Sequence, residues 1–172
     1  TQTPYDDGRM IDERLHLSEA ETRKLYIDLL LHEAGWTVTE QVGKIVPRQA
    51  GIEIEVQGMP NESGMGYADY VLFDADGTPL AVVEAKRTNV DAVAGRHQAE
   101  LYADCLAARY VCPRPVIYYT NGFETNIIDG IGYPSRKVMG FHTIDELRRM
   151  IAQRGRADIT DLQISDRITN RN

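Results

Sequence analysis

Apolar and polar residues follow each other along the chain in patterns that predict several β-strands. Residues 51–57 alternate strictly, which is typical of a strand with one face in water. Short apolar runs rich in β-branched and aromatic residues predict further strands at 70–73, 80–83 and 116–119. We also expect a short strand at 36–39 and a further strand pair at 125–128 and 137–141.

Helices are predicted before and between these strands. Ser18 and Glu21 have the spacing of a capping box, in which a serine and a glutamate bond the first free N–H groups of a helix. The helix that they open runs through Leu25 and Leu29 and stops at Gly35, a residue suited to the position after a helix.

Two more helices are expected later in the chain. One covers roughly 90–109, and the other follows a second capping box formed by Thr143 and Glu146. No internal repeat or low-complexity tract interrupts this succession of strands and helices.

The residues between the predicted strands at 70–73 and 80–83 indicate a tight hairpin. Asp76-Gly77 supplies the positive φ values that a type I′ turn requires. If the turn centres on this pair, Asp69 faces Glu84 across the ladder, with Cβ atoms roughly 5 Å apart. Lys86 lies two residues beyond Glu84 and therefore projects from the same face of the strand.

Two carboxylates placed in this way repel each other, and burial in an apolar strand makes the repulsion more costly. A divalent cation removes the conflict, because Mg²⁺ prefers carboxylate, water and phosphate oxygens. Lys86 then places a positive charge beside a scissile phosphate or an attacking water. The alternative from spacing alone is an edge hairpin in which Asp69, Glu84 and Lys86 form ordinary solvated pairs.

For the other candidate residues, the sequence alone favours a structural reading over a functional one. Glu21 is a capping residue, or else it points from its helix toward the hairpin. Gln98 and Tyr102 lie four residues apart and share one face of a helix. As a bare pair they are typical of a half-buried tyrosine with a polar neighbour.

Composition limits the classes of protein to consider. The 172 residues suit one domain, and no apolar run approaches the length of a membrane span or the core of a signal peptide. Cys105 and Cys112 match no metal or redox spacing, so we expect a reducing cytoplasm. The net charge of −7 argues against a general basic DNA binder.

These motifs together resemble the PD-(D/E)XK nuclease superfamily, and more closely the N-terminal endonuclease domain of type I restriction enzyme R (motor) subunits. The resemblance extends from Ser18 to about Arg149. Its motifs, in chain order, are the helix from Glu21 to Gly35-Trp36, the strand Ala68 to Leu72, the strand Val83 to Arg87, the pair Gln98 and Tyr102, and the turn Thr120-Asn121-Gly122. The proline that often precedes the first aspartate in the superfamily is replaced here by Ala68.

The resemblance implies an α/β restriction-endonuclease-like core, with a central mixed β-sheet flanked by helices. It also implies Mg²⁺-dependent hydrolysis of DNA phosphodiester bonds, with Mn²⁺ as a substitute metal. Asp69, Glu84 and the carbonyl of Ala85 would bind the metal, and Lys86 would orient the attacking water or stabilise the transition state. Glu21 would lie near the metal, whereas Gln98, Tyr102 and Arg87 would brace the lysine strand or contact DNA.

The same resemblance sets expectations for the larger assembly. Residues 1–17 would be an arm, 18–153 the nuclease domain, and 154–172 a linker toward a helicase domain of the same full-length chain, which would bind ATP. The expected partners are double-stranded DNA and the methyltransferase and specificity subunits, with no membrane contact. The alternatives are a stand-alone or repair-type nuclease and a degenerate, non-catalytic module that docks a helicase or binds DNA.

Overall fold

The computed structural model describes residues 19–86, 92–131 and 135–154. The elements in chain order are α2 (Glu19–Glu33), β1 (Thr37–Val38), β2 (Gln49–Gln57), β3 (Met65–Phe73), β4 (Pro79–Ala85), α3 (Ala92–Tyr110), β5 (Val116–Thr120), β6 (Thr125–Ile128) and β7 (Arg136–Val138). A further helix covers 144–154. The predicted arm at 1–17, the predicted cap Ser18 and almost all of the predicted linker lie outside the described residues.

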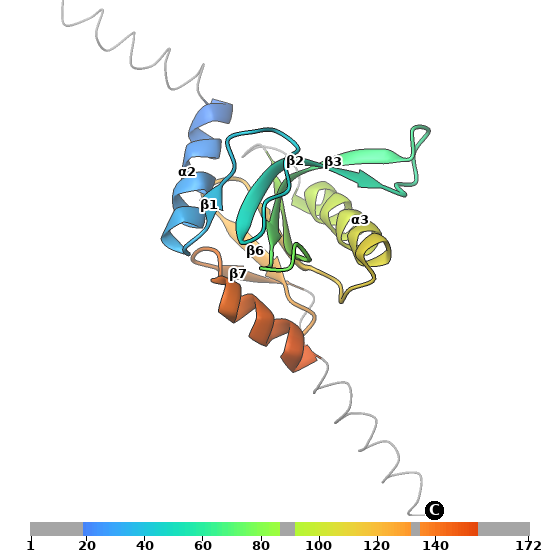
Figure 1. The fold of residues 1–172 in the computed structure, drawn as a ribbon. Coiled ribbons are helices and arrows are strands. Elements are labelled where there is room, and N and C mark those ends of the chain that lie inside the picture. The colour runs from blue at the N-terminus through green and yellow to red at the C-terminus, as the bar shows by residue number, and fades with distance from the viewer. Residues whose placement is uncertain (1–18, 87–91, 132–134, 155–172) are drawn as a thin grey trace, which may run out of the picture.

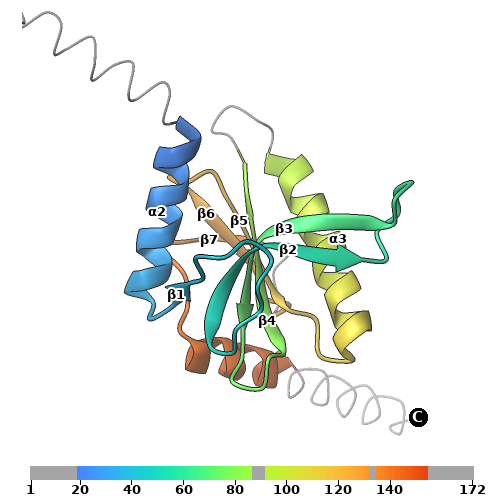
Figure 2. The same cartoon turned by 45° about the horizontal axis from the view of Figure 1, so that its top comes forward.

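The strands form one mixed sheet with the order β1-β2-β3-β4-β5-β6-β7. β1 and β2 are parallel, as are β4 and β5, and the other neighbours are antiparallel. α3 connects the parallel strands β4 and β5 across one face of the sheet, while α2 lies on the other side (Figures 1 and 2). The expected α/β fold, a mixed sheet flanked by helices, is therefore confirmed.

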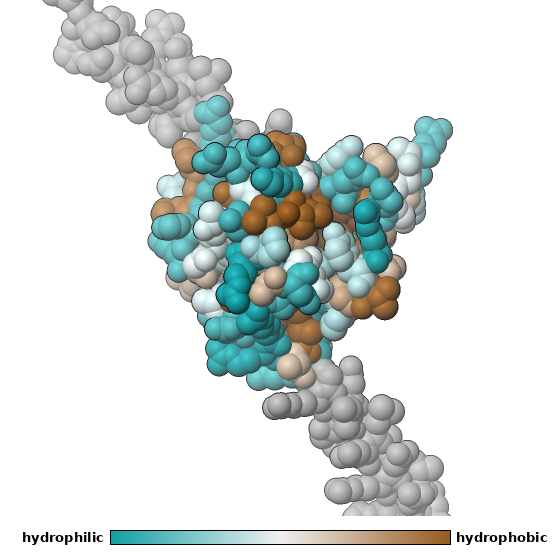
Figure 3. Space-filling view, in the orientation of Figure 1, coloured by the Kyte–Doolittle hydropathy of each residue, from teal (hydrophilic) through white to brown (hydrophobic). Residues whose placement is uncertain are grey.

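Each face of the sheet has its own hydrophobic core. On the α2 side, Ile27 and Leu31 are fully buried with Trp36 against strands β2 to β6. On the α3 side, Ala99 and Leu106 pack against the opposite face of the same strands. Figure 3 shows that the outer surface in the view of Figure 1 is mostly hydrophilic, with a small apolar area near its centre.

The first helix has its predicted position, but its buried face differs from the leucines that mark it in the sequence. Leu25 and Leu29 are 68% and 52% exposed. Ile27 and Leu31, which lie four residues apart on another face of the helix, are fully buried instead. Across the part of the chain that the structure describes, no helix is both long enough and apolar enough to cross a membrane.

The β3–β4 hairpin has the predicted pairing but not the predicted turn. Tyr70 pairs with Val83 and Val71 with Val82, the register that places Asp69 opposite Glu84. In the turn, however, Asp74 N–H donates to Thr78 O at 2.8 Å, and only Gly77 has a positive φ, of 83°. The expected type I′ turn on Asp76-Gly77 is therefore wrong.

The loop has three residues between Asp74 and Thr78, which by itself would shift the register by one residue. An irregularity between Leu72 and Phe73, opposite one extra residue of β4, restores it. The hairpin thus reaches the predicted register through a different turn and a bulge.

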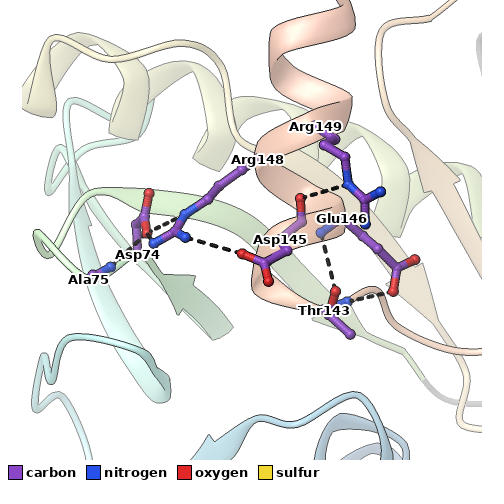
Figure 4. A network of polar contacts seen from close by, with 7 residues as sticks. All are labelled: Asp74, Ala75, Thr143, Asp145, Glu146, Arg148 and Arg149. Atoms are coloured by element: carbon purple, nitrogen blue, oxygen red, sulfur yellow. Dashed lines mark hydrogen bonds and ion pairs between the residues drawn. The ribbon is translucent and has the colours of Figure 1, made fainter.

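The helix at 144–154 begins with the predicted capping box and contacts this turn. Glu146 N–H donates to Thr143 Oγ1 at 3.2 Å, and Thr143 N–H donates to Glu146 Oε1 at 3.4 Å. Arg148 forms an ion pair with Asp74 and a second one with Asp145 at 3.2 Å (Figure 4). The helix therefore fastens the tip of the hairpin to the rest of the domain.

Candidate active site

Asp69 and Glu84 come together at the ends of the two central antiparallel strands. One step beyond the Tyr70–Val83 pair, Asp69 lies opposite Glu84, and its N–H approaches Glu84 Oε2 at 3.5 Å. Asp69 Oδ2 accepts a hydrogen bond of 2.7 Å from the N–H of Ala85. Glu84 is only 4% exposed, so the pair holds two acidic groups largely out of water.

Burial changes the acidity of both groups. Desolvation raises the pKa of Asp69, partly offset by the Ala85 hydrogen bond and the charges of Lys86 and Arg23. Desolvation together with the charge of Asp69 raises the pKa of Glu84 to about 8. Without a cation, the two carboxyl groups therefore do not both ionise easily at neutral pH.

Lys86 lies beside this pair and is held by a short chain of polar contacts. Its Nζ is 3.4 Å from Glu84 Oε1 and donates a 3.0 Å hydrogen bond to Gln98 Oε1. The Gln98 side-chain amide in turn donates to the hydroxyl of Tyr102 at 2.7 Å. Gln98 and Tyr102 therefore share one face of α3, as their spacing predicted, and this face is turned toward the lysine, as the resemblance implied.

Tyr102 is also a core residue. It is 2% exposed and packs with the cluster on the α3 side of the sheet. Its ring lies so close to Gly66 of β3 that a Cβ there would be 2.7 Å from Tyr102 Cε1. Packing thus fixes the ring, and the hydroxyl fixes the orientation of the Gln98 amide.

The α2 side of the site has a different set of side chains. Tyr70 donates a 2.7 Å hydrogen bond to Asp28 of α2, which ties this helix to the strand that carries Asp69. Glu21 is exposed on the first turn of α2, and the cleft beside Asp69 is lined from α2 by Arg23, Lys24 and Ile27. A metal role for Glu21 therefore stays a prediction.

Some candidates were missed from the sequence, and one cannot be placed. Arg87 lies outside the described residues. The cleft beside Asp69 also contains Arg23, Lys24 and Glu53, none of which the sequence motifs indicated. Arg23 precedes the buried Ile27 by one helical turn, a spacing that places it at the edge of the core. Glu53 has a φ of 48° inside an otherwise regular strand, and local sequence gives no sign of it.

The donors at this site fit a hard divalent cation. Two carboxylates lie side by side, and the ionised form of each is disfavoured until a positive charge compensates it. Among the described residues, no group of three or more His, Cys, Asp or Glu side chains forms a metal site. If Mg²⁺ binds here, Asp69, Glu84 and the carbonyl of Ala85 are the groups expected to hold it, with water and substrate oxygens completing its shell.

Comparisons with known proteins find similarity to type I restriction enzymes. A family model described as the second domain of the type I restriction enzyme EcoKI endonuclease subunit matches residues 43–124, which include the whole β2–β5 region. The EcoKI endonuclease subunit of Escherichia coli K12 is 39% identical over 102 residues, or 55% of this chain. The chain spans only 8% of the length of that subunit.

A solved structure has a fold similar to that of this chain. It is the fragment of a protein assigned as the HsdR subunit of a type I restriction enzyme from Vibrio vulnificus YJ016. The two chains are 27% identical with a TM-score of 0.55, over 79% of this chain and 25% of the other. This chain is thus similar in sequence and fold to parts of the endonuclease (R) subunits of type I restriction enzymes, as its motifs indicated.

Proposed function

We propose that this chain is the Mg²⁺-dependent DNA endonuclease domain of a type I restriction enzyme R subunit. The observation that carries the proposal is the convergence of Asp69, Glu84 and Lys86 at one end of the β3–β4 pair. Burial of two carboxylates whose charge is only partly compensated by one lysine lowers the stability of the fold. A domain that only docks another protein gains nothing from that cost. The degenerate, non-catalytic alternative is therefore disfavoured.

The side chains of the site would divide the work between them. Asp69, Glu84 and the Ala85 carbonyl would hold the cation, which when bound polarises the phosphoryl oxygen and lowers the pKa of a bound water. Lys86 would donate to the attacking water or to the charge that develops on the phosphoryl oxygens. Gln98 and Tyr102 would act through Lys86 as positioning residues, because they fix where its ammonium group lies.

The remaining parts of the assembly are proposed from the relatives. Their names describe endonuclease and HsdR subunits of type I restriction enzymes, which are far longer than this chain. We propose a helicase domain in the same full-length chain as the site of ATP, and methyltransferase and specificity subunits as partners. Double-stranded DNA would be the substrate, with Mn²⁺ able to replace Mg²⁺.

Plasmid nicking by the complete restriction assembly tests the proposal. The parent should nick or linearise DNA with Mg²⁺ and stop when the metal is chelated. Lys86→Ala should slow cleavage by roughly 10²- to 10³-fold, the usual cost of removing one transition-state donor. Lys137→Ala, which removes an exposed lysine of β7, is the matched control and should cut normally. Equal cleavage by Lys86→Ala and the parent would overturn the assignment.

A further inference from the structure

A cleft of about 250 Å³ opens beside Asp69, between α2 and the strands β2 and β3. Asp69 and Ala85 of the candidate metal site line it. Arg23 and Lys24 of α2 and Glu53 of β2 line it as well. The cleft is therefore the space through which a substrate phosphate can reach the site from the α2 side.

Arg23 is held in this cleft by its hydrocarbon stem and not by an ion pair. A Cβ at Gly122 would lie 3.1 Å from Arg23 Cγ and 3.4 Å from its Cα, so the turn after β5 packs directly on the residue. Among the described residues, none forms a hydrogen bond or salt bridge with the Arg23 guanidinium. Arg23 nevertheless lines the same cleft as Asp69, and its charge acts to lower the pKa of the Asp69 carboxyl.

The same turn also holds the lysine of the site. Lys86 N–H donates to Thr120 O at 2.8 Å, and Gly122 N–H donates to Thr120 Oγ1 at 3.0 Å. The turn at 120–122 therefore fixes the main chain of Lys86 on one side and the stem of Arg23 on the other. Two cationic groups are placed around the carboxylate pair by one small structural unit.

We propose that Arg23 binds a non-bridging oxygen of a DNA phosphodiester in this cleft, which makes it a substrate-binding residue. The proposal rests on the nuclease function proposed above. A guanidinium presents a planar fork of donors that matches a phosphate group, and an unpaired one needs no rearrangement to bind it. In a chain of net charge −7, such local cations are where a DNA strand can approach.

The surrounding charges set the side on which the phosphate binds. Glu53 of β2, which also lines the cleft, repels a phosphate, whereas the exposed Lys24 adds a second positive charge next to Arg23 on α2. The phosphate is thus expected against α2, on the side of Asp69 away from Gln98 and Tyr102. Lys24 strengthens the attraction without a fixed position, so Arg23 should carry the larger effect.

Binding of a short DNA duplex to the full chain in EDTA, measured over a range of salt concentrations, tests the proposal. Arg23→Gln keeps the Cβ and Cγ atoms that pack on Gly122 but removes the charge. We expect the slope of log K against log[salt] to become shallower by about 0.9, the value for one lost phosphate contact. Arg23→Lys should restore most of the slope. Arg109→Gln, an exposed arginine at the end of α3, removes the same charge elsewhere and should leave the slope unchanged.

The outcomes separate this proposal from the nuclease proposal. An unchanged slope in a folded Arg23→Gln protein, an equal loss in Arg109→Gln, or no DNA binding by the parent would overturn the role of Arg23. If Arg23→Gln fails to fold, Arg23→Met replaces it, because it also keeps the Cβ and Cγ atoms and removes the charge; a slope shallower by about 0.9 supports the contact and an unchanged slope overturns it. Hydrolysis plays no part in this measurement, so the plasmid assay tests the nuclease function separately.

Discussion

At the scale of single residues, the burial of Glu84 couples its charge to the stability of the fold. Its pKa is raised from 4.5 to about 8, chiefly by desolvation and by the charge of Asp69. Between these two pH values the unfolded chain has released the proton while the folded chain still binds it. The free energy of unfolding therefore decreases as the pH rises through this range, and each pKa unit corresponds to about 1.4 kcal/mol.

We therefore expect the melting temperature of the metal-free protein to fall between about pH 5 and pH 8. Glu84→Gln should show a smaller fall, because an amide does not ionise. Mg²⁺ should raise the melting temperature of the parent more at the upper end of this range, since it binds the ionised carboxylates. Thermal denaturation at several pH values, with and without Mg²⁺, measures both effects.

Glu55→Gln is the control for this experiment, because Glu55 is an exposed glutamate of the neighbouring strand β2. It should follow the parent in both its pH dependence and its response to Mg²⁺. A Mg²⁺ shift of the same size in Glu84→Gln and in the parent would rule out Glu84 as a metal ligand.

At the scale of elements, the hairpin separates what local sequence determines from what it does not. The register is reached only because the bulge between Leu72 and Phe73 compensates for a three-residue loop, so the turn assumed for it does not explain it. The strands themselves were predictable from their apolar runs. The turn was not, because distant contacts shape it: Arg48 N–H donates to Asp74 O at 3.3 Å, and Arg148 pairs with the Asp74 carboxylate.

The same distinction holds for the candidate site. Asp69, Glu84 and Lys86 follow from strand alternation and register, and their convergence could be predicted. Arg23 could not, because its place in the cleft depends on a turn almost 100 residues later that packs against its stem. A motif within one hairpin can thus be recognised from sequence. A side chain from a separate helix can be assigned to the site only when the packing of that helix is known.

The contact between α3 and β4 leads to a prediction about Gln98. Gln98→Ala removes the acceptor that holds Lys86 at 3.0 Å, and the lysine is then free to turn fully toward Glu84. We expect DNA cleavage by the complete assembly to fall roughly tenfold, because small misplacement of a catalytic group costs rate heavily. ATP hydrolysis, which under the proposed assembly uses a separate helicase domain, should stay near normal and serves as the internal control.

Tyr102 allows a finer test of the same contact. Tyr102→Phe keeps the buried ring and removes only the hydroxyl that orients the Gln98 amide. The loss of one hydrogen bond of about 1 kcal/mol corresponds to roughly fivefold slower cleavage, measured as the initial rate of plasmid nicking. If Tyr102→Phe cuts at the parental rate while Tyr102→Ala unfolds, the tyrosine is a core residue alone and its positioning role is wrong.

At the scale of the whole molecule, one sheet separates two cores that share its strands. Leu31 belongs to the core under α2, and Leu106 to the core under α3. The lone tryptophan, Trp36, reports on the first core, since it is buried there and its indole N–H donates to His142 O at 2.9 Å. Cys105 is packed against the second core, so its thiol reports on the other face.

Because every strand from β2 to β6 contributes to both cores, we expect the two faces to unfold as one cooperative unit. In a Cys112→Ser background, urea unfolding followed by Trp36 fluorescence and by pulse labelling of Cys105 should give the same midpoint. Leu31→Ala and Leu106→Ala each leave a cavity in one core, and each should cost about 2–5 kcal/mol.

The decisive comparison is whether a cavity in one core changes the unfolding midpoint measured on the other face. Both midpoints should move together in each variant, because neither core can persist once the shared strands separate. Leu29→Ala, a truncation of a leucine that is 52% exposed on α2, should change either midpoint by less than about 0.5 kcal/mol. If Leu106→Ala lowers the Cys105 midpoint and leaves Trp36 fluorescence at its parental midpoint, the sheet does not couple its two faces. Mg²⁺ bound at the carboxylate pair would then stabilise one face of the sheet without the other.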